Sequence, residues 1–158
     1  MRRGLLWKRI LLCGVLGLLA LAVLIQAVPY GRAHMNPPVR AEPAWNAPLT
    51  RDLAARACFD CHSNQVTWPW YSNIAPVSWL IQRDVDEGRS TLNFSEWKRP
   101  QEGTGDVVEA VLGKSMPPWY FTLLHSNAKL SKLEREQLAR GLQSTIAKSP
   151  PPGRTGGG

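Results

Sequence analysis

The hydrophobic pattern of the chain begins with one long uncharged stretch. Residues 10–28 (ILLCGVLGLLALAVLIQAV) contain no charged side chain over 19 positions. A helix of this length, rising about 1.5 Å per residue, is long enough to cross a hydrocarbon core of about 30 Å. The pattern therefore predicts a single-pass membrane anchor over residues 1–28, with Trp7 and Tyr30 at its ends as interfacial aromatic residues.

A cleaved signal peptide is the main alternative for this stretch. Ile25 and Ala27 make a weak cleavage site, but the apolar region of a signal peptide is usually about 7–15 residues long, so we favour the uncleaved anchor. A lipoprotein signal at Cys13 is disfavoured, because Leu12 stands where a small residue is expected. Anchor and signal peptide alike would carry the following residues out of the cytoplasm.

The rest of the chain divides by composition into three parts. Residues 29–49 hold five prolines and little periodicity, which predicts an extended stalk. Residues 50–148 carry helical patterns and are the expected domain. Residues 149–158 (SPPPGRTGGG) read as a disordered tail.

Within residues 50–148 the start and stop signals are those of short helices. Thr50 is a candidate cap for a helix leading to Cys58, and Pro76 suits the first position of a helix that stops at Gly88. The other signals are a turn opened by Ser95, a segment from Asp106 to Gly113, and a Ser131–Glu134 capping box before Leu138, Leu142 and Ile146 at spacing four. No stretch alternates cleanly enough to be a strand. We therefore expect an all-α domain of four or five short helices.

The charge distribution argues against a nucleic-acid ligand, although the formal net charge is +7. Residues 42–148 contain 12 Lys and Arg against 12 Asp and Glu, so the expected domain is neutral. The excess lies beside the apolar stretch and in the tail, at Arg2, Arg3, Lys8, Arg9, Arg32, Arg40 and Arg154. Four of these charges precede the span, which predicts a cytoplasmic N-terminus and a domain in the periplasm or outside.

The chemistry begins at Cys58-Phe59-Asp60-Cys61-His62. Positions i, i+3 and i+4 share one face of a helix, so Cys58, Cys61 and His62 point the same way. C-x-x-C-H is the attachment signature of haem c, in which two thioethers hold the porphyrin and the histidine ligates the iron. The sequence thus predicts one covalently attached haem c in an exported domain.

Three other interpretations of the motif fit less well. A thioredoxin-like thiol pair needs a strand–helix context, which is absent here. A structural zinc needs four ligands, and only His125 and His34 remain outside the span. A disulfide between Cys58 and Cys61 explains the cysteines but gives His62 no role.

The sixth iron ligand is expected to be Met116, the one methionine of residues 50–148. Pro117 and Pro118 bias Met116 away from helix and make a stiff loop that suits a thioether ligand. His125 and an open iron site are the alternatives.

The surroundings of the haem can also be proposed from the sequence. Arg83, Arg89 or Arg99 could meet its propionates. Aromatic residues could wall the haem; they are Trp68, Trp70, Tyr71, Trp79, Phe94, Trp97, Trp119, Tyr120 and Phe121.

A longer pattern resembles the bacterial haem-binding domain family of single-haem membrane proteins. Its parts are C58-F-D-C-H-S-N-Q-V-T-W-P-W-Y-S-N-I-A-P-V-S-W-L-I-Q-R-D-V-D-E-G-R-S, L92-N-F-S-E-W, M116-P-P-W-Y and S131-K-L-E-R-E-Q-L, with N36-P-P-V before them. The resemblance covers roughly residues 10–147. It implies a cytochrome-c-like helical domain with haem c held by Cys58, Cys61 and His62, and it supplies neither a partner nor a reaction.

For function we expect single-electron transfer at the outer face of the cytoplasmic membrane. The partners would be the lipid bilayer and redox proteins. No hydrolytic motif is present, so we expect a carrier rather than an enzyme. The alternative is a haem enzyme or a gas or redox sensor with an open sixth site, in which His125 would be the one distal acid or base of the domain.

Overall fold

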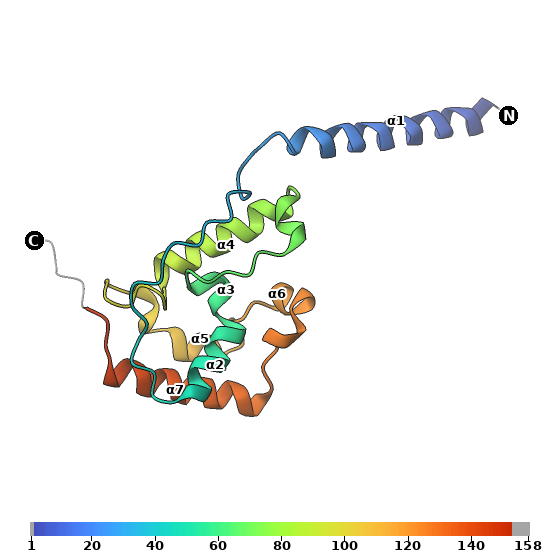
Figure 1. The fold of residues 1–158 in the computed structure, drawn as a ribbon. Helices are drawn as coiled ribbons and strands as arrows, with labels where there is room; N and C mark the ends of the chain where they lie inside the picture. Colours follow the sequence, from blue (N-terminus) through green and yellow to red (C-terminus); the bar gives the residue numbers. More distant parts are fainter. Residues whose placement is uncertain (1, 153–158) are drawn as a thin grey trace, which may run out of the picture. The chain divides into compact units, whose positions relative to one another are not determined.

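The computed structural model describes residues 2–152, and within this range it contains helices and no strand (Figure 1). The elements are α1 (Arg2–Ile25), α2 (Pro48–Ala57), α3 (Phe59–His62), η1 (Trp70–Asn73), α4 (Val77–Thr91), η2 (Glu102–Thr104), α5 (Val107–Leu112), α6 (Trp119–Leu124), η3 (Ser126–Ala128) and α7 (Lys132–Lys148), where η marks 3₁₀-helices. The all-α prediction is confirmed. Most of the predicted tail, residues 153–158, lies outside the described range.

The chain forms two compact units. One consists of Met1–His34 and Pro69–Arg83, and the other of Met35–Trp68 and Asp84–Gly158. Each unit is described by itself below.

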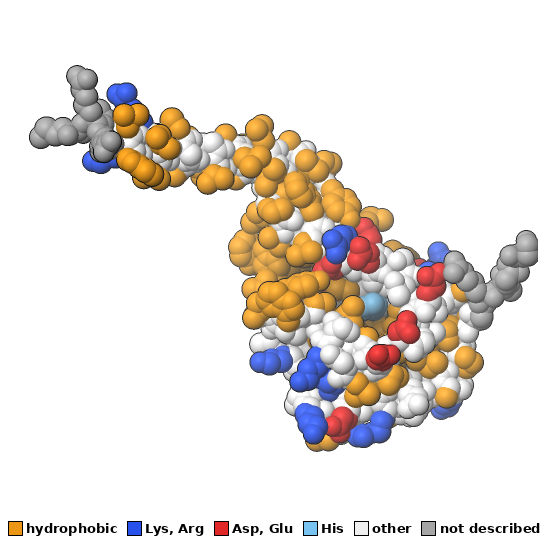
Figure 2. Space-filling view, turned by 180° about the vertical axis from the view of Figure 1, so that it is seen from behind, with side chains coloured by type: hydrophobic (Ala, Val, Ile, Leu, Met, Phe, Trp, Pro, Cys, Tyr) orange, Lys and Arg blue, Asp and Glu red, His pale blue; other side chains and the backbone are white. Residues whose placement is uncertain are grey.

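Helix α1 dominates the first unit. Its segment Leu6–Ile25 has 20 residues, a mean hydropathy of 2.3 and no buried residue, so it is long and apolar enough to cross a membrane. Figure 2 shows hydrophobic side chains along its length. The apolar helix predicted from the sequence is therefore present.

The second unit is organised by α7, which packs against α2 and α5 (Figure 1). Leu138 and Leu142, which recur at the predicted spacing of four in α7, are fully buried. Burying such a side chain contributes about 1.5–3 kcal/mol. The predicted capping box is also confirmed, since the Ser131 hydroxyl accepts from the Glu134 N–H and the Glu134 carboxylate accepts from the Ser131 N–H.

Thr50 does not cap α2, contrary to the prediction. The helix starts at Pro48, and Ala47 is its N-cap. Proline is well suited to a first helical position, because its missing N–H is not needed there. Thr50 is instead buried in the first turn against Gly141 of α7, where a Cβ atom would lie 2.2 Å from the Thr50 hydroxyl oxygen. The close crossing of α2 and α7 therefore uses both residues.

Residues 36–41, inside the segment predicted as a stalk, are hydrogen bonded to the second unit. The Asn36 side chain donates to the Val66 carbonyl at 2.8 Å. The N–H groups of Arg40 and Ala41 donate to the Ser95 carbonyl at 2.9 and 3.1 Å. These bonds make residues 36–41 an ordered part of this unit.

Candidate functional site

The residues of the C-x-x-C-H motif lie on one helical turn. The helix breaks at Cys58, which joins the end of α2 to the start of α3. The Cys58 carbonyl accepts from the N–H groups of Cys61 and His62, at 3.1 and 2.8 Å. The turn therefore keeps the i, i+3, i+4 relationship predicted for the two thiols and the imidazole, even though the helix is not continuous.

The imidazole of His62 is held in one tautomer. Its Nδ1 atom lies 3.0 Å from the Leu92 carbonyl oxygen. A carbonyl can only accept, so Nδ1 carries the proton and Nε2 keeps its lone pair for a metal. Burial lowers the pKa of His62, against the opposing effect of hydrogen bonding to the backbone of Leu92 and Gly88. The ring is therefore neutral at neutral pH and presents a metal-binding nitrogen.

A second bond fixes the backbone of the same residue. The Phe94 N–H donates to the His62 carbonyl at 2.8 Å, so residues 92–94 hold His62 at both its ring and its main chain. Histidine ligands of metals commonly donate their other N–H to a carbonyl in this way, which fixes the ring and raises its basicity.

Buried polar side chains hold this segment in shape. Asn93 donates to the Asn64 side-chain oxygen at 2.9 Å and accepts from the Ser95 N–H at 2.8 Å. Its own N–H donates to the Gln101 side chain at 2.8 Å. Asn93 is 2% exposed. Without these hydrogen bonds, the polar groups involved would be buried and unpaired, which folded proteins avoid.

Helix α4 runs past its predicted end and packs on the motif. We expected Gly88 to end this helix, but α4 continues to Thr91. A Cβ atom on Gly88 would lie 2.4 Å from the Cys61 carbonyl oxygen, so this glycine is required by close packing of α4 on the attachment turn. The prediction used Gly88 as a stop signal, whereas its role is to remove a side chain from a helix contact.

The two cysteines are free thiols in half-buried residues, with no disulfide between them. Burial raises the pKa of both thiols to about 12. For Cys61, the carboxylates of Asp84 and Asp60 act in the same direction. Among residues 2–152, no three His, Cys, Asp or Glu side chains gather into a group that could hold a metal ion, so the motif is not arranged as a three-ligand cage.

Met116 lies in the loop between α5 and α6. Its N–H donates to the Ala110 carbonyl at 3.1 Å, and its carbonyl accepts from Arg135 of α7 at 3.3 Å. The residue is 38% exposed. The structure therefore anchors the backbone of Met116 at both polar groups and leaves the residue partly exposed.

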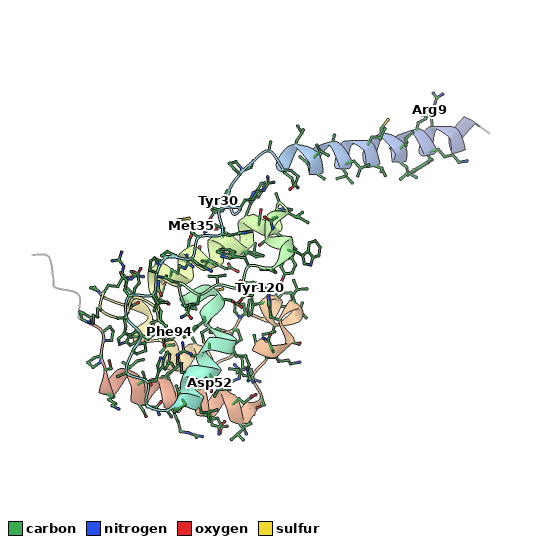
Figure 3. All side chains as sticks on the ribbon, viewed as in Figure 1. Arg9, Tyr30, Met35, Asp52, Phe94 and Tyr120 are labelled. Atoms are coloured by element: carbon green, nitrogen blue, oxygen red, sulfur yellow. The ribbon has the colours of Figure 1, made fainter. Side chains whose placement is uncertain are left out.

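The start of α6 reaches the surroundings of the motif. The hydroxyl of Tyr120, a residue labelled in Figure 3, donates to Asp84 at 3.0 Å. Asp84 is close enough to Cys61 to raise the pKa of its thiol. The loop that carries Met116 leads directly into this helix. His125, at the other end of α6, stacks on Phe121 with ring centroids 4.0 Å apart and an interplanar angle of 14°.

The predicted aromatic wall and propionate partners divide into different roles. Phe94 and Trp97 are buried and stacked, with centroids 5.8 Å apart, whereas Trp70 and Trp119 are 76% and 73% exposed. The guanidinium of Arg89 donates to the carbonyls of Ser63 and Met35 and to Asn36, and that of Arg99 donates to the Arg89 carbonyl. The guanidinium groups of Arg89 and Arg99 are thus committed to protein acceptors.

A helical domain that presents a neutral histidine and two free cysteines on one turn has the donor set of a haem protein. The chain belongs to the haem-binding domain family, whose sequence profile matches residues 20–144. No curated protein and no solved structure matches the chain significantly. Residues 20–144 therefore form a haem-binding domain.

The sequence did not indicate the residues that position His62. Leu92 acts through its backbone carbonyl, which no side-chain pattern reveals. Asn93 and Ser95 belong to the L-N-F-S-E-W segment that carried part of the family resemblance, so that segment was the available signal.

Proposed function

We propose that the haem is of type c and that one haem is attached covalently through Cys58 and Cys61. The observation that carries this proposal is the His62–Leu92 bond, which leaves Nε2 of a neutral imidazole for the iron on the same turn as two free thiols. When bound, the haem supplies reversible one-electron chemistry at its iron. The protein side chains bind it, orient the proximal ring and exclude water.

Denaturing electrophoresis with haem staining tests this proposal. The stain should stay with the polypeptide of the wild type and be lost from the Cys58→Ala, Cys61→Ala variant. Cys13→Ala, which removes the remaining cysteine, is the matched control and should keep the stain. Stain that leaves the wild-type chain on denaturation would show that the haem is not covalently attached.

We propose Met116 as the second axial ligand, with His125 and an open site as the alternatives. Three hydrogen bonds support it. Ala110 and Arg135 hold the Met116 backbone, and the Tyr120–Asp84 bond ties the helix that follows to the surroundings of Cys61. His62 and Met116 would hold the iron together, and methionine ligation would favour its reduced form.

The function that follows is single-electron transfer at the outer face of the cytoplasmic membrane, between redox proteins. An anchored carrier stays close to membrane partners, which raises its effective concentration there. A haem enzyme or sensor is the alternative and would require an open sixth position. A low-spin spectrum that changes slowly or not at all with carbon monoxide supports the carrier, and rapid carbon monoxide binding by high-spin iron supports the alternative.

The proposed topology places the N-terminus in the cytoplasm and the haem domain in the periplasm or outside. Alkaline phosphatase fused after Lys148 should be active, because this enzyme needs an exported, oxidising location. A fusion that is inactive although it is produced in full would contradict the topology.

A further inference from the structure

Residues 69–80, which precede α4 and form its first turn, are uncharged and include several exposed apolar side chains. No Asp, Glu, Lys or Arg occurs between Asp60 and Arg83. In the first unit, large apolar side chains of this segment reach the surface, with exposures of 76% for Trp70, 44% for Ile74, 39% for Val77 and 42% for Leu80. Figure 2 shows hydrophobic side chains gathered where this segment lies next to the end of α1. Exposed apolar surface of this kind marks an interaction site.

The segment is bound to the residue that follows the candidate membrane span. Gln26 comes directly after Ile25, the last residue of α1. Its side-chain amide donates to the Ala75 carbonyl and accepts from the Ala75 N–H, both at 3.0 Å. This paired bond fixes Ala75 to the end of α1.

Two further contacts hold the same segment along the connection that leaves α1, where Figure 3 labels Tyr30. Gly31 has a φ of +82°, and a Cβ atom there would lie 2.2 Å from the Ser78 carbonyl oxygen. His34 lies 3.0 Å from the Ser72 hydroxyl through its Nε2 atom. Residues 72–78 are therefore attached at several positions within the first few residues after the helix.

The bonds to Gln26 determine how deep residues 72–78 lie relative to a membrane that α1 crosses. The headgroup layer on each side of a bilayer is about 5–8 Å thick, and tryptophan and tyrosine concentrate there. Because Gln26 follows the span immediately, a backbone bonded to Gln26 lies within this layer when α1 crosses the membrane. The apolar side chains next to Ala75 would then meet lipid rather than water.

We propose that residues 69–80 form an interfacial lipid contact, in which Trp70, Ile74, Val77 and Leu80 insert into the outer headgroup and upper acyl region of the membrane that α1 crosses. Gln26 bonds Ala75 of this surface to the end of α1, and the segment Leu6–Ile25 of α1 has no buried residue. Because residues 69–80 carry no charge, their contact with lipid is one of apolar burial. The inference rests on the proposed span of α1 and is independent of the haem type.

Photolabelling of the full chain in vesicles tests this contact. The vesicles contain phosphatidylethanolamine and phosphatidylglycerol, with a small share of phospholipid that carries a diazirine high on one acyl chain. Fragmentation mass spectrometry then locates the adducts. We expect adducts on α1 and on residues 69–80, and none on Leu133 of α7, an apolar residue of similar exposure at 62%. The labelling of residues 69–80 should not change between about 0.1 M and about 1 M salt.

The double variant Trp70→Ser, Leu80→Ser should lose the adducts of residues 69–80 while α1 remains labelled. The wild-type pattern decides the question even if this variant folds poorly. Adducts on α1 with none on residues 69–80 would overturn the lipid contact and leave the proposed span intact. The same conclusion holds if cross-linking then finds a second copy of the chain or another protein on this surface. A chain whose α1 is also unlabelled would contradict the proposed span.

Discussion

The Nδ1 atom of His62 donates to the carbonyl oxygen of Leu92 at 3.0 Å, and this bond decides which ring nitrogen is free. The acceptor lies 30 positions further along the chain, in the segment that follows α4. Because the Phe94 N–H also holds the His62 carbonyl, the segment fixes the ring and the main chain together. The orientation of the proximal ligand thus depends on a loop that is held by its own buried polar side chains.

Asn93→Ala should loosen this loop. The substitution leaves the Asn64 side-chain oxygen and the Ser95 N–H without their partner in a buried setting, which costs about 1–3 kcal/mol of unfolding free energy. We expect a lower denaturation midpoint in urea, followed by circular dichroism, and a shifted haem absorption spectrum. Asn73→Ala is the control, since Asn73 is exposed and donates only to the nearby Trp70 carbonyl. Equal midpoints for the two variants would contradict the role of Asn93.

Gly88→Ala should separate α4 from the turn formed by the C-x-x-C-H motif, residues 58–62. The new methyl group would meet the Cys61 carbonyl oxygen at 2.4 Å, and the backbone on either side must move. Overpacking of this kind costs about 1–3 kcal/mol, and we expect both a lower melting temperature and a smaller haem-loaded fraction. Gly105→Ala is the matched control, because a Cβ atom there meets nothing within 4 Å and the backbone is already helical. A Gly88→Ala protein as stable as Gly105→Ala would show that the close approach is not needed.

Met116→Ala should remove the proposed second axial ligand. Oxidised haem with His–Met ligation is expected to show a weak sulfur-to-iron charge-transfer band near the red end of the spectrum, and the variant should lose it while its reduction potential falls. His125→Ala should keep the band, because the proposed ligand Met116 is still present in that variant. If the band persists in Met116→Ala and His125→Ala instead loses low-spin character, the ligand is His125.

The lowered pKa of Glu134 predicts that the folded protein loses stability in acid. Hydrogen bonding to Arg56, and then to Ser131, lowers the pKa of Glu134 from 4.5 to about 2. A lowered pKa means that the folded state favours the carboxylate, so its contribution is present above pH 4.5 and is lost as the pH falls towards 2. Glu134→Gln should therefore flatten the melting temperature against pH in this window. Glu136→Gln is the control, since Glu136 lies 4.0 Å from Arg140 in an exposed pair, and it should leave the slope unchanged.

The sequence by itself determined the features that depend on neighbours along the chain. The uncharged run defined α1, the spacing of Cys58, Cys61 and His62 put them on one turn, and Ser131 with Glu134 marked the start of α7. Each of these signals acts within a few residues, where helix geometry alone relates one side chain to the next. Such signals were sufficient for the fold class and for the haem motif.

Only the tertiary structure decided the roles of residues whose partners are distant. Thr50 and Gly88 look like a cap and a stop in the sequence, yet they permit close contacts with Gly141 of α7 and with Cys61. The Leu92 carbonyl has no sequence signature as the acceptor for His62, because every residue carries the same backbone group. Local patterns predict which residues form a helix, whereas the space available between packed helices decides what a small or polar residue does there.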